Sequence, residues 1–238
     1  MAASGSTESA ERSVMKKLSA GLSGRHEPVQ DRSKASVDRI LAMTATLLDE
    51  VGIERFNTNL LAERTGVRVR TVYRYFPNKY AVIAALTKKL AVQWDELMTE
   101  YYAKIADPEA DWRAVTRGVD GQWLRRARNV PGALSVLQAM NATPELKQLH
   151  FQIFEDMSKK LAGALAARGL ELPPARLLAI ARTITAATTS RTDLYLQLRG
   201  RGAVEFLQEG SLLEERYLGA YLSEPRRSSR KPKRTKGV

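Results

Sequence analysis

The segment Asn57 to Lys79, NTNLLAERTGVRVRTVYRYFPNK, decides the fold of this chain. Gly66 comes four residues after Ala62, and Val72 comes six residues after Gly66. Glycine can adopt the positive φ of a tight turn, so the small alanine and the β-branched valine can face each other across it. This spacing predicts two short helices that meet at a sharp angle, a helix-turn-helix.

The charge around this segment indicates what it binds. Between residues 64 and 94 there are seven basic residues and no carboxylate, and a helix pair with that balance is suited to the phosphates of a nucleic acid. We expect the second helix to run from about Arg68 to Tyr75, with Val72 and Phe76 packed inward. The alternative interpretation is a solvated basic face on an ordinary three-helix unit. In the DNA-binding interpretation, the residues left to face the groove are Val69, Arg70, Thr71, Tyr73 and Arg74.

Residues 33–90 resemble the DNA-binding domain of the TetR family of bacterial transcriptional regulators. Three quoted stretches carry the resemblance: RILAMTATLLDEVG (39–52), LLAERTGV (60–67) and TVYRYFPNK (71–79). The first stretch reads as an amphipathic helix, because apolar residues recur every three or four positions and Gly52 ends it. The last stretch has the proline, polar cap and lysine with which the family opens its fourth helix.

The resemblance also assigns roles within the segment. It implies that Arg68 replaces the small polar residue that usually caps the recognition helix, so we expect Arg68 to contact phosphate. Arg70 replaces a residue that is commonly small, which favours an operator with a guanine that the arginine grips through O6 and N7. The implied base-reading residues are Asn59, Val69, Arg70, Thr71, Tyr73 and Arg74. The implied backbone-positioning residues are Asn57, Thr58, Arg68, Tyr75 and Lys79.

Two of these positions agree with local helix chemistry. Asn57 is a good N-cap, because its side chain can satisfy an orphan backbone amide while the helix N-terminus points at a phosphate. Lys79 lies in the first turn of the next helix, where a cation opposes the helix dipole. That mild penalty is understandable if a phosphate lies opposite the lysine.

Length and composition favour a regulator over a bare DNA-binding module. The chain has 238 residues, 44% of them hydrophobic, which is enough for one small and one larger helical domain. Its start has no apolar signal-peptide core, and no stretch approaches a membrane span, so a cytoplasmic protein is expected. We predict four regions: a flexible extension (1–32), the helix-turn-helix domain (33–78), a ligand-binding and dimerisation domain (79–224) and a disordered basic tail (225–238).

The net charge of +12 is concentrated at the end of the chain. Residues 225–238 carry seven basic residues and no acidic one. Such a tail either adds non-specific DNA affinity or is simply a solvated end.

Beyond Lys79 the sequence predicts helix after helix, interrupted at Pro108, Pro131, Pro144, Pro173 and the glycines near 200. The expected helices span about 79–104, 111–128, 132–141, 144–168, 174–199 and 203–222. With the first three they make an all-α chain of about nine helices, as in the family.

The last two helices are the implied homodimer surface, by the same resemblance. One stripe contains Leu177, Ile180, Ala181, Ile184 and Thr188, and bulky apolar residues follow from Val204 to Tyr221. These stripes can instead close the core of a single protomer, and periodicity does not decide between the two. A dimer also suits a DNA reader, since two heads about 34–36 Å apart fit successive major-groove faces of a palindrome.

The middle helices are the implied site of a small, hydrophobic inducer. Large adaptable apolar residues occur there with a few polar anchors. The candidate ligand-binding residues are Trp94, Met98, Trp123, Met140, Phe151, Phe154, Thr185 and Thr189.

The sequence contains no catalytic constellation. Cysteine is absent and there are two histidines, so neither a thiolate nor a histidine metal cluster is expected, and no glycine-rich phosphate loop indicates a cofactor. We therefore predict a regulator, most simply a repressor, that binds a palindromic operator as a dimer and is released by a small hydrophobic molecule. The alternative is an architectural, low-specificity DNA-binding protein without an inducer.

Overall fold

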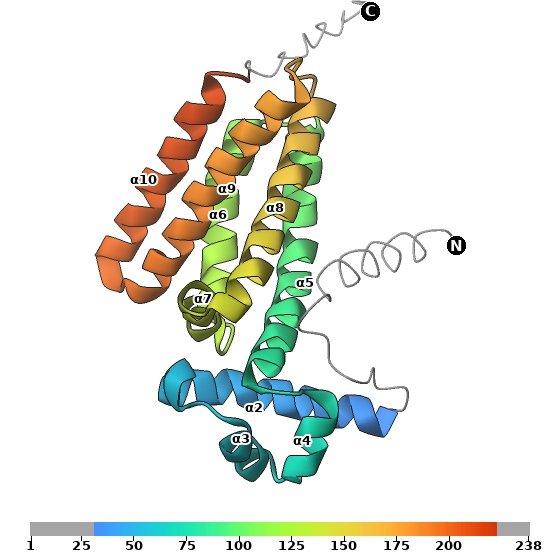
Figure 1. The fold of residues 1–238 in the computed structure, drawn as a ribbon. Coiled ribbons are helices and arrows are strands. Elements are labelled where there is room, and N and C mark those ends of the chain that lie inside the picture. The colour runs from blue at the N-terminus through green and yellow to red at the C-terminus, as the bar shows by residue number, and fades with distance from the viewer. Residues whose placement is uncertain (1–30, 223–238) are drawn as a thin grey trace, which may run out of the picture.

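The computed structural model describes residues 31–222 (Figure 1). The described part contains nine helices, labelled α2 to α10, so the all-α class predicted from the sequence is confirmed. The predicted basic tail lies outside these residues. So does the predicted N-terminal extension, apart from its last two residues, which begin α2.

Three helices form a small head at one end of the molecule: α2 (Asp31–Arg55), α3 (Thr58–Thr65) and α4 (Val69–Tyr75). The regular part of α2 is broken at Gly52, whose φ is 69°. A left-handed residue, Gly66 with φ 69° and ψ 14°, ends α3. A β-branched or bulky side chain is strained at that φ, so glycine is what lets α4 turn sharply away from α3.

The remaining helices form the body. They are α5 (Lys79–Ala106), α6 (Trp112–Arg128), α7 (Ala133–Ala142), α8 (Pro144–Ala167), α9 (Pro174–Gln197) and α10 (Gly200–Gly219). Proline opens both α8 and α9, where its missing N–H costs nothing. Figure 1 shows α5 rising from the head along the body, with α8 beside it, α9 beside α8 and α10 on the far side of α9.

The hydrophobic core is continuous between head and body. One cluster of buried residues joins Ile40 and Leu47 of α2 to Val82 of α5 and to Val136 and Leu146 of α7 and α8. A second cluster lies farther along the body around the fully buried Trp112. Because apolar packing is dense and resists deformation, a displacement of α5 or α7 must also displace the helices of the head.

Candidate DNA-binding face and ligand pocket

Helix α4 has one buried and one exposed side. Val72 and Tyr75 are 0% and 3% exposed, whereas Val69 and Tyr73 are 40% and 43% exposed. The side of this seven-residue helix that faces away from the core thus presents both apolar and charged side chains to solvent. The exposed side of α4 is therefore a candidate contact surface.

Arginines supply the charge of this exposed side. Arg68 and Arg70 are exposed, and within the described residues neither makes a hydrogen bond or an ion pair. Arg74 is different: it donates to the hydroxyl of Tyr75, and its guanidinium carbon lies 4.6 Å from the centroid of that ring. Two guanidiniums are thus available to an outside acceptor, and the third is oriented by the ring beneath it.

A side-chain hydrogen bond ties α3 to α4. The hydroxyl of Thr58, which is 7% exposed, donates to the hydroxyl of Tyr73 at 2.9 Å. The N-terminus of α3 is capped by Asn57, whose Oδ1 accepts from the backbone N–H groups of Asn59 and Leu60 at 3.1 and 2.9 Å. The cap and the cross-link hold the exposed sides of the two helices in a fixed relation.

The start of α5 is also tied to the head. Asn78 caps it by accepting from the N–H of Ala81 at 2.9 Å. Lys79 donates to the carbonyl of Ile53 at 3.0 Å, so this ammonium stabilises the end of α2 and keeps two of its three protons for other acceptors.

The residues predicted to bind DNA thus fall into two groups. Asn57, Asn59, Arg68, Val69, Arg70, Tyr73 and Arg74 are exposed on one part of the head, and Thr71 and Lys79 are partly buried beside them. Thr58 and Tyr75 are buried, and their hydroxyls have partners within the chain. The sequence does not reveal this second group, because both hydrogen bonds depend on how α4 packs.

The joint between head and body is a helix cap supplied from α2. The carboxylate of Asp49 accepts from the N–H of Gly132 and from the hydroxyl of Ser135, both at 2.7 Å. Gly132 has φ 76°, and a Cβ built there would lie 2.8 Å from the Cα of Ala45. The backbone of the α7 start therefore sits directly on α2, and glycine is needed for that approach.

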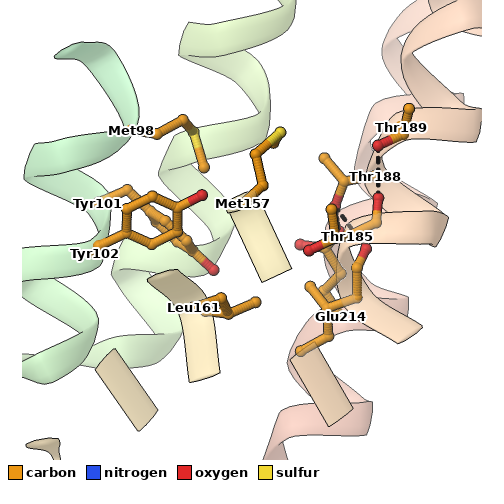
Figure 2. Close-up of a pocket in the computed structure, with 10 residues that line it drawn as sticks. Met98, Tyr101, Tyr102, Met157, Leu161, Thr185, Thr188, Thr189 and Glu214 are labelled. Carbon is orange, nitrogen blue, oxygen red and sulfur yellow. Dashed lines mark hydrogen bonds between the residues drawn. The ribbon is translucent and has the colours of Figure 1, made fainter. Parts of the chain in front are cut away.

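A pocket opens in the body between α5, α8, α9 and α10 (Figure 2). It encloses about 500 Å³ of space, which includes the open solvent at its mouth. The volume that the centre of a water-sized sphere can reach is about 40 Å³, so a drug-sized ligand fits only if the walls move apart. The lining residues are Met98, Tyr101, Tyr102, Met157, Leu161, Ile184, Thr185, Thr188, Thr189 and Glu214.

One acidic residue in the pocket wall was not anticipated. Glu214 is 3% exposed, and its Oε1 accepts from the Thr188 hydroxyl at 2.5 Å and from Arg191. Gly210 makes room for that guanidinium, since a Cβ there would lie 1.9 Å from Nη1 of Arg191. The sequence contains one indication: Glu214 lies four residues after Gly210 and four before Leu218, so the three residues share the buried side of α10.

The residues predicted to bind ligand are dispersed. Met98, Thr185 and Thr189 line the pocket. Met140 is 2% exposed in the core, and Trp94 packs against that core. Phe151 is 56% exposed and stacks on Phe154 with the ring centroids 6.3 Å apart. The side chain of Trp123 lies outside what the structure describes.

The phenol of Tyr102 in the pocket keeps its proton. Burial, and then the nearby charge of Asp95, raise the pKa of Tyr102 above its ordinary value, so this side chain stays neutral at physiological pH. Asp95 itself pairs with Lys160 across α5 and α8. His150, a half-buried residue of α8, has its pKa lowered by desolvation, which favours its neutral form.

The described residues give no sign of two other kinds of site. No helix in residues 31–222 has both the length and the apolar character to cross a membrane. In the same part of the chain, no three histidine, cysteine or acidic side chains gather as a metal site would require.

A capped helix-turn-helix with an exposed basic face, joined to a helical body that holds a pocket, defines a DNA-binding protein of the regulator class. Residues 40–86 match the family model described as bacterial regulatory proteins, tetR family, and residues 111–218 match the tetracyclin repressor-like C-terminal domain. The chain belongs to the TetR family and is a DNA-binding transcriptional regulator. The family consists of regulators and not of enzymes, and its members bind operator DNA and small ligands, typically as dimers.

Curated relatives of two kinds are similar to this chain. The nucleoid occlusion factor SlmA of Haemophilus ducreyi is 28% identical over 151 residues, which are 61% of this chain and 68% of that protein. The class A tetracycline repressor from transposon 1721 of Escherichia coli is 29% identical over 86 residues, 36% of this chain and 37% of the repressor.

Two solved structures share the fold. A TetR-family regulator from Streptomyces coelicolor superposes with a TM-score of 0.58 at 24% identity, covering 79% of this chain and 99% of that one. The SmeT–triclosan complex gives 0.59 at 18% identity, covering 79% and 92%. At these identities the likeness concerns the fold alone.

Proposed function

We propose that this protein is a ligand-responsive repressor that binds a palindromic operator as a homodimer and is released by a small hydrophobic molecule. The observation that carries the proposal is that one helix serves both regions. Helix α5 begins at the DNA-binding head and lines the pocket with Met98, Tyr101 and Tyr102. Occupation of the pocket therefore has a direct mechanical route to the head.

On DNA, the exposed side of α4 enters the major groove. Arg70 reads a guanine through O6 and N7, because its guanidinium is exposed and has no partner among the described residues. Val69, Thr71, Tyr73, Arg74 and Asn59 contact neighbouring bases. Asn57 and Arg68 hold the phosphate backbone with Lys79, whose ammonium has protons to spare, while Thr58 and Tyr75 act through the groups that they orient.

Two copies pair through α9 and α10. Exposed apolar side chains on these helices and in the short segment between them support this: Leu194, Leu198, Val204, Leu212 and Leu213 are between 38% and 58% exposed. The stripe Leu177, Ile180, Ala181 and Ile184 is not part of this surface, because it is buried inside the protomer. An exposed set of this size is costly for a lone chain and is covered in a dimer.

Helix α5 transmits the signal as a lever that is fixed at its far end. Arg168 donates to the carbonyls of Ile105, Asp107, Pro108 and Ala110, at distances from 2.6 to 3.4 Å. These bonds clamp the end of α5, so a ligand that pushes on its middle moves its free end at Lys79 most. Two heads tilted in this way no longer match consecutive grooves, and by linkage operator DNA must weaken ligand binding by the same factor.

The start of α7 is a second route to the head. The bonds from Gly132 and Ser135 to Asp49 make α2 follow α7. Helix α7 packs on α8, which forms one wall of the pocket. A ligand that displaces α8 therefore moves the head through α7 and α2 as well as through α5.

The proposal is tested by selecting bound sequences from random duplex DNA at physiological salt. The full chain is compared with a variant truncated before Pro225. A discrete palindrome retained by the truncated protein supports a specific regulator. Loss of binding with the tail, or no enriched motif, contradicts the proposal.

A second candidate is an architectural DNA-binding protein without an inducer. The similarity to proteins named nucleoid occlusion factors, over 61% of this chain, is the observation that favours it. Such a protein should show a steep salt dependence and little discrimination between sequences. The same selection, repeated at two salt concentrations, therefore separates the two candidates.

A further inference from the structure

The end of α9 is held by an arginine from α6. Arg128, the last residue of α6, donates from Nη2 to the carbonyls of Tyr195 and Leu198 at 2.5 and 2.8 Å. Its guanidinium carbon lies 4.0 Å from the centroid of the buried Tyr195 ring. The last carbonyls of a helix lack partners within the helix, and a planar guanidinium can bond them while it stacks on a ring. The end of α6 is thus fixed to the end of α9.

Four residues after Arg128, the chain is fixed to the head. Gly132 donates its backbone N–H to the Asp49 carboxylate of α2 at 2.7 Å. It also lies so close to the backbone of Ala45 that a Cβ would not fit between them. Residues 129–131 are therefore a connector between one anchor on α9 and a second anchor on α2.

The connector is stiff. Pro131 has a fixed φ, and the backbone N–H of Ala133 donates to the carbonyl of Val130 at 3.2 Å across the turn. The side chain of Val130 packs against the core cluster that joins the head to the body. Because neither the turn nor the packing leaves much freedom, the two anchors move together.

The anchor on α9 lies at the proposed dimer surface. Leu194 and Leu198, on either side of the Arg128 anchor in the sequence, are 50% and 38% exposed. Leu198 thus gives its carbonyl to Arg128 and leaves much of its side chain to a partner. Figure 1 shows the turn between α9 and α10 at the end of the body nearer the head. The connector therefore runs from the dimer surface to the head.

We infer that Arg128 is a positioning residue that sets the angle between each head and the dimer surface, and thereby the spacing of operator half-sites that the dimer accepts. The inference rests on the proposed homodimer and assigns its choice of spacing to a side chain outside the DNA-binding head. Each base pair added between half-sites moves one of them by about 3.4 Å and turns it by roughly 35°. A head held at one angle tolerates neither change, whereas a loosely held head tolerates both.

The test compares operators of different spacing. The selected operator is lengthened or shortened by one base pair at its centre, and binding of each form to the full-length protein is measured by fluorescence anisotropy. We expect the wild type to lose at least about tenfold in affinity for either altered operator. Arg128→Gln and, separately, Pro131→Gly should lose less than about threefold. The second variant softens the connector at an exposed residue, so a fold defect in one variant leaves the other informative.

Arg125→Gln is the matched control. Arg125 is an exposed residue of α6, three positions before Arg128, and makes no hydrogen bond or ion pair with a described residue. Its preference for spacing should equal that of the wild type. Sedimentation velocity should show dimers for all the variants. A monomeric Arg128→Gln would overturn the assigned role, because Arg128 would then hold the interface together and not position the head.

A second readout needs no operator. With one spin label in each head, at Glu54→Cys, pulsed electron paramagnetic resonance gives the distribution of distances between the heads of the free dimer. We expect a narrow distribution in the wild-type background and in Arg125→Gln, and a broad one in Arg128→Gln and Pro131→Gly.

The outcomes separate the inference from the proposed function. A wild type that is indifferent to spacing, or variants that keep the full preference and the narrow distribution, overturn the role of Arg128. Absence of a palindrome from the operator selection contradicts the proposed repressor instead, and the label distances still decide whether Arg128 positions the head.

Discussion

The start of the recognition helix and the body differ in whether their arginines have partners. In the head, Arg68 and Arg70 point outward with no partner among the described residues. In the body, Arg191 pairs with Glu214, Arg182 with Glu155, and Arg168 with four backbone carbonyls. Charges with partners hold a structure together, whereas charges left without partners await a ligand. The head is thus a prepared surface for an anion, and the body is a frame around a neutral cavity.

The contact between α2 and the start of α7 joins these two regions, and one added methyl group there should destabilise the protein most. Gly132→Ala places a Cβ against the backbone of Ala45 at a residue with φ 76°. We expect a loss of about 3 kcal/mol in the free energy of unfolding, from overpacking and backbone strain together. Urea denaturation followed by circular dichroism measures it.

Gly163→Ala is the control for that substitution. Nothing lies within 4 Å of a Cβ built at Gly163 in α8, so alanine should be neutral or should stabilise the protein by up to about 1 kcal/mol. An equal loss in both variants would show that the joint is not a tight contact.

Removing a charge from the head should affect DNA binding and leave stability unchanged. Arg70→Ala should weaken operator binding by roughly 1–3 kcal/mol and relax the choice of base at one position. Fluorescence anisotropy with the selected operator and its single-base variants measures both effects. Arg216→Ala, an exposed arginine of α10, is the matched control. An equal loss of operator affinity in Arg216→Ala would show that Arg70 contributes its positive charge and no base-specific contact.

The cap at the start of α5 tests the link between the regions. Asn78→Ala removes the acceptor for the Ala81 N–H, which should cost about 1 kcal/mol of stability and weaken the response of the head to the pocket. Thermal unfolding and release of the selected operator by a compound found in an inducer screen are the measurements. Asn141→Ala, at an exposed residue of α7 without a recorded hydrogen bond, should change neither.

A charged pair in the body gives the smallest effect, and this effect depends on pH. The hydrogen bond from Arg182 is the main cause of the lowered pKa of Glu155. A carboxyl with a depressed pKa in the folded state contributes stability above its ordinary pKa and loses it as the pH falls through the folded value. Arg182→Gln should therefore be slightly less stable than the wild type at neutral pH, and the difference should shrink as the pH falls below the ordinary pKa of glutamate, about 4.3, and vanish once Glu155 is protonated in the folded state. A difference that persists in acid would mean that Arg182 acts through packing.

The same contrast explains what the sequence could and could not predict. The first helix begins at Asp31, eight residues before its expected start at Arg39, but the other helices lie within three residues of their expected bounds, because caps, prolines and glycines act locally. The head was recognisable because its turn spacing is fixed within one short segment. The pocket depends on how four helices distant in sequence meet, so Met98 and Thr189 were anticipated by residue type, while Tyr101, Tyr102 and Glu214 were not.

The stripe on α9 shows the limit of periodicity most clearly. A helix with one apolar side can bury it against its own chain or against a partner, and the pattern is the same in both cases. In this chain, Leu177 and Ile184 face the protomer core, because α8 lies along α9 and covers that side. The side left for a partner carries leucines such as Leu194.

The most direct test of the coupling between head and body is a distance between the two heads of the dimer. The chain has no cysteine, so a spin label at Glu54→Cys, an exposed position on α2, gives one label in each head. Pulsed electron paramagnetic resonance then measures the distance between the two labels with the operator bound, and again with a compound that releases the operator in an inducer screen. The account predicts one narrow distance on DNA and a clearly different one once the compound is bound. Release of the operator with an unchanged distance would contradict it.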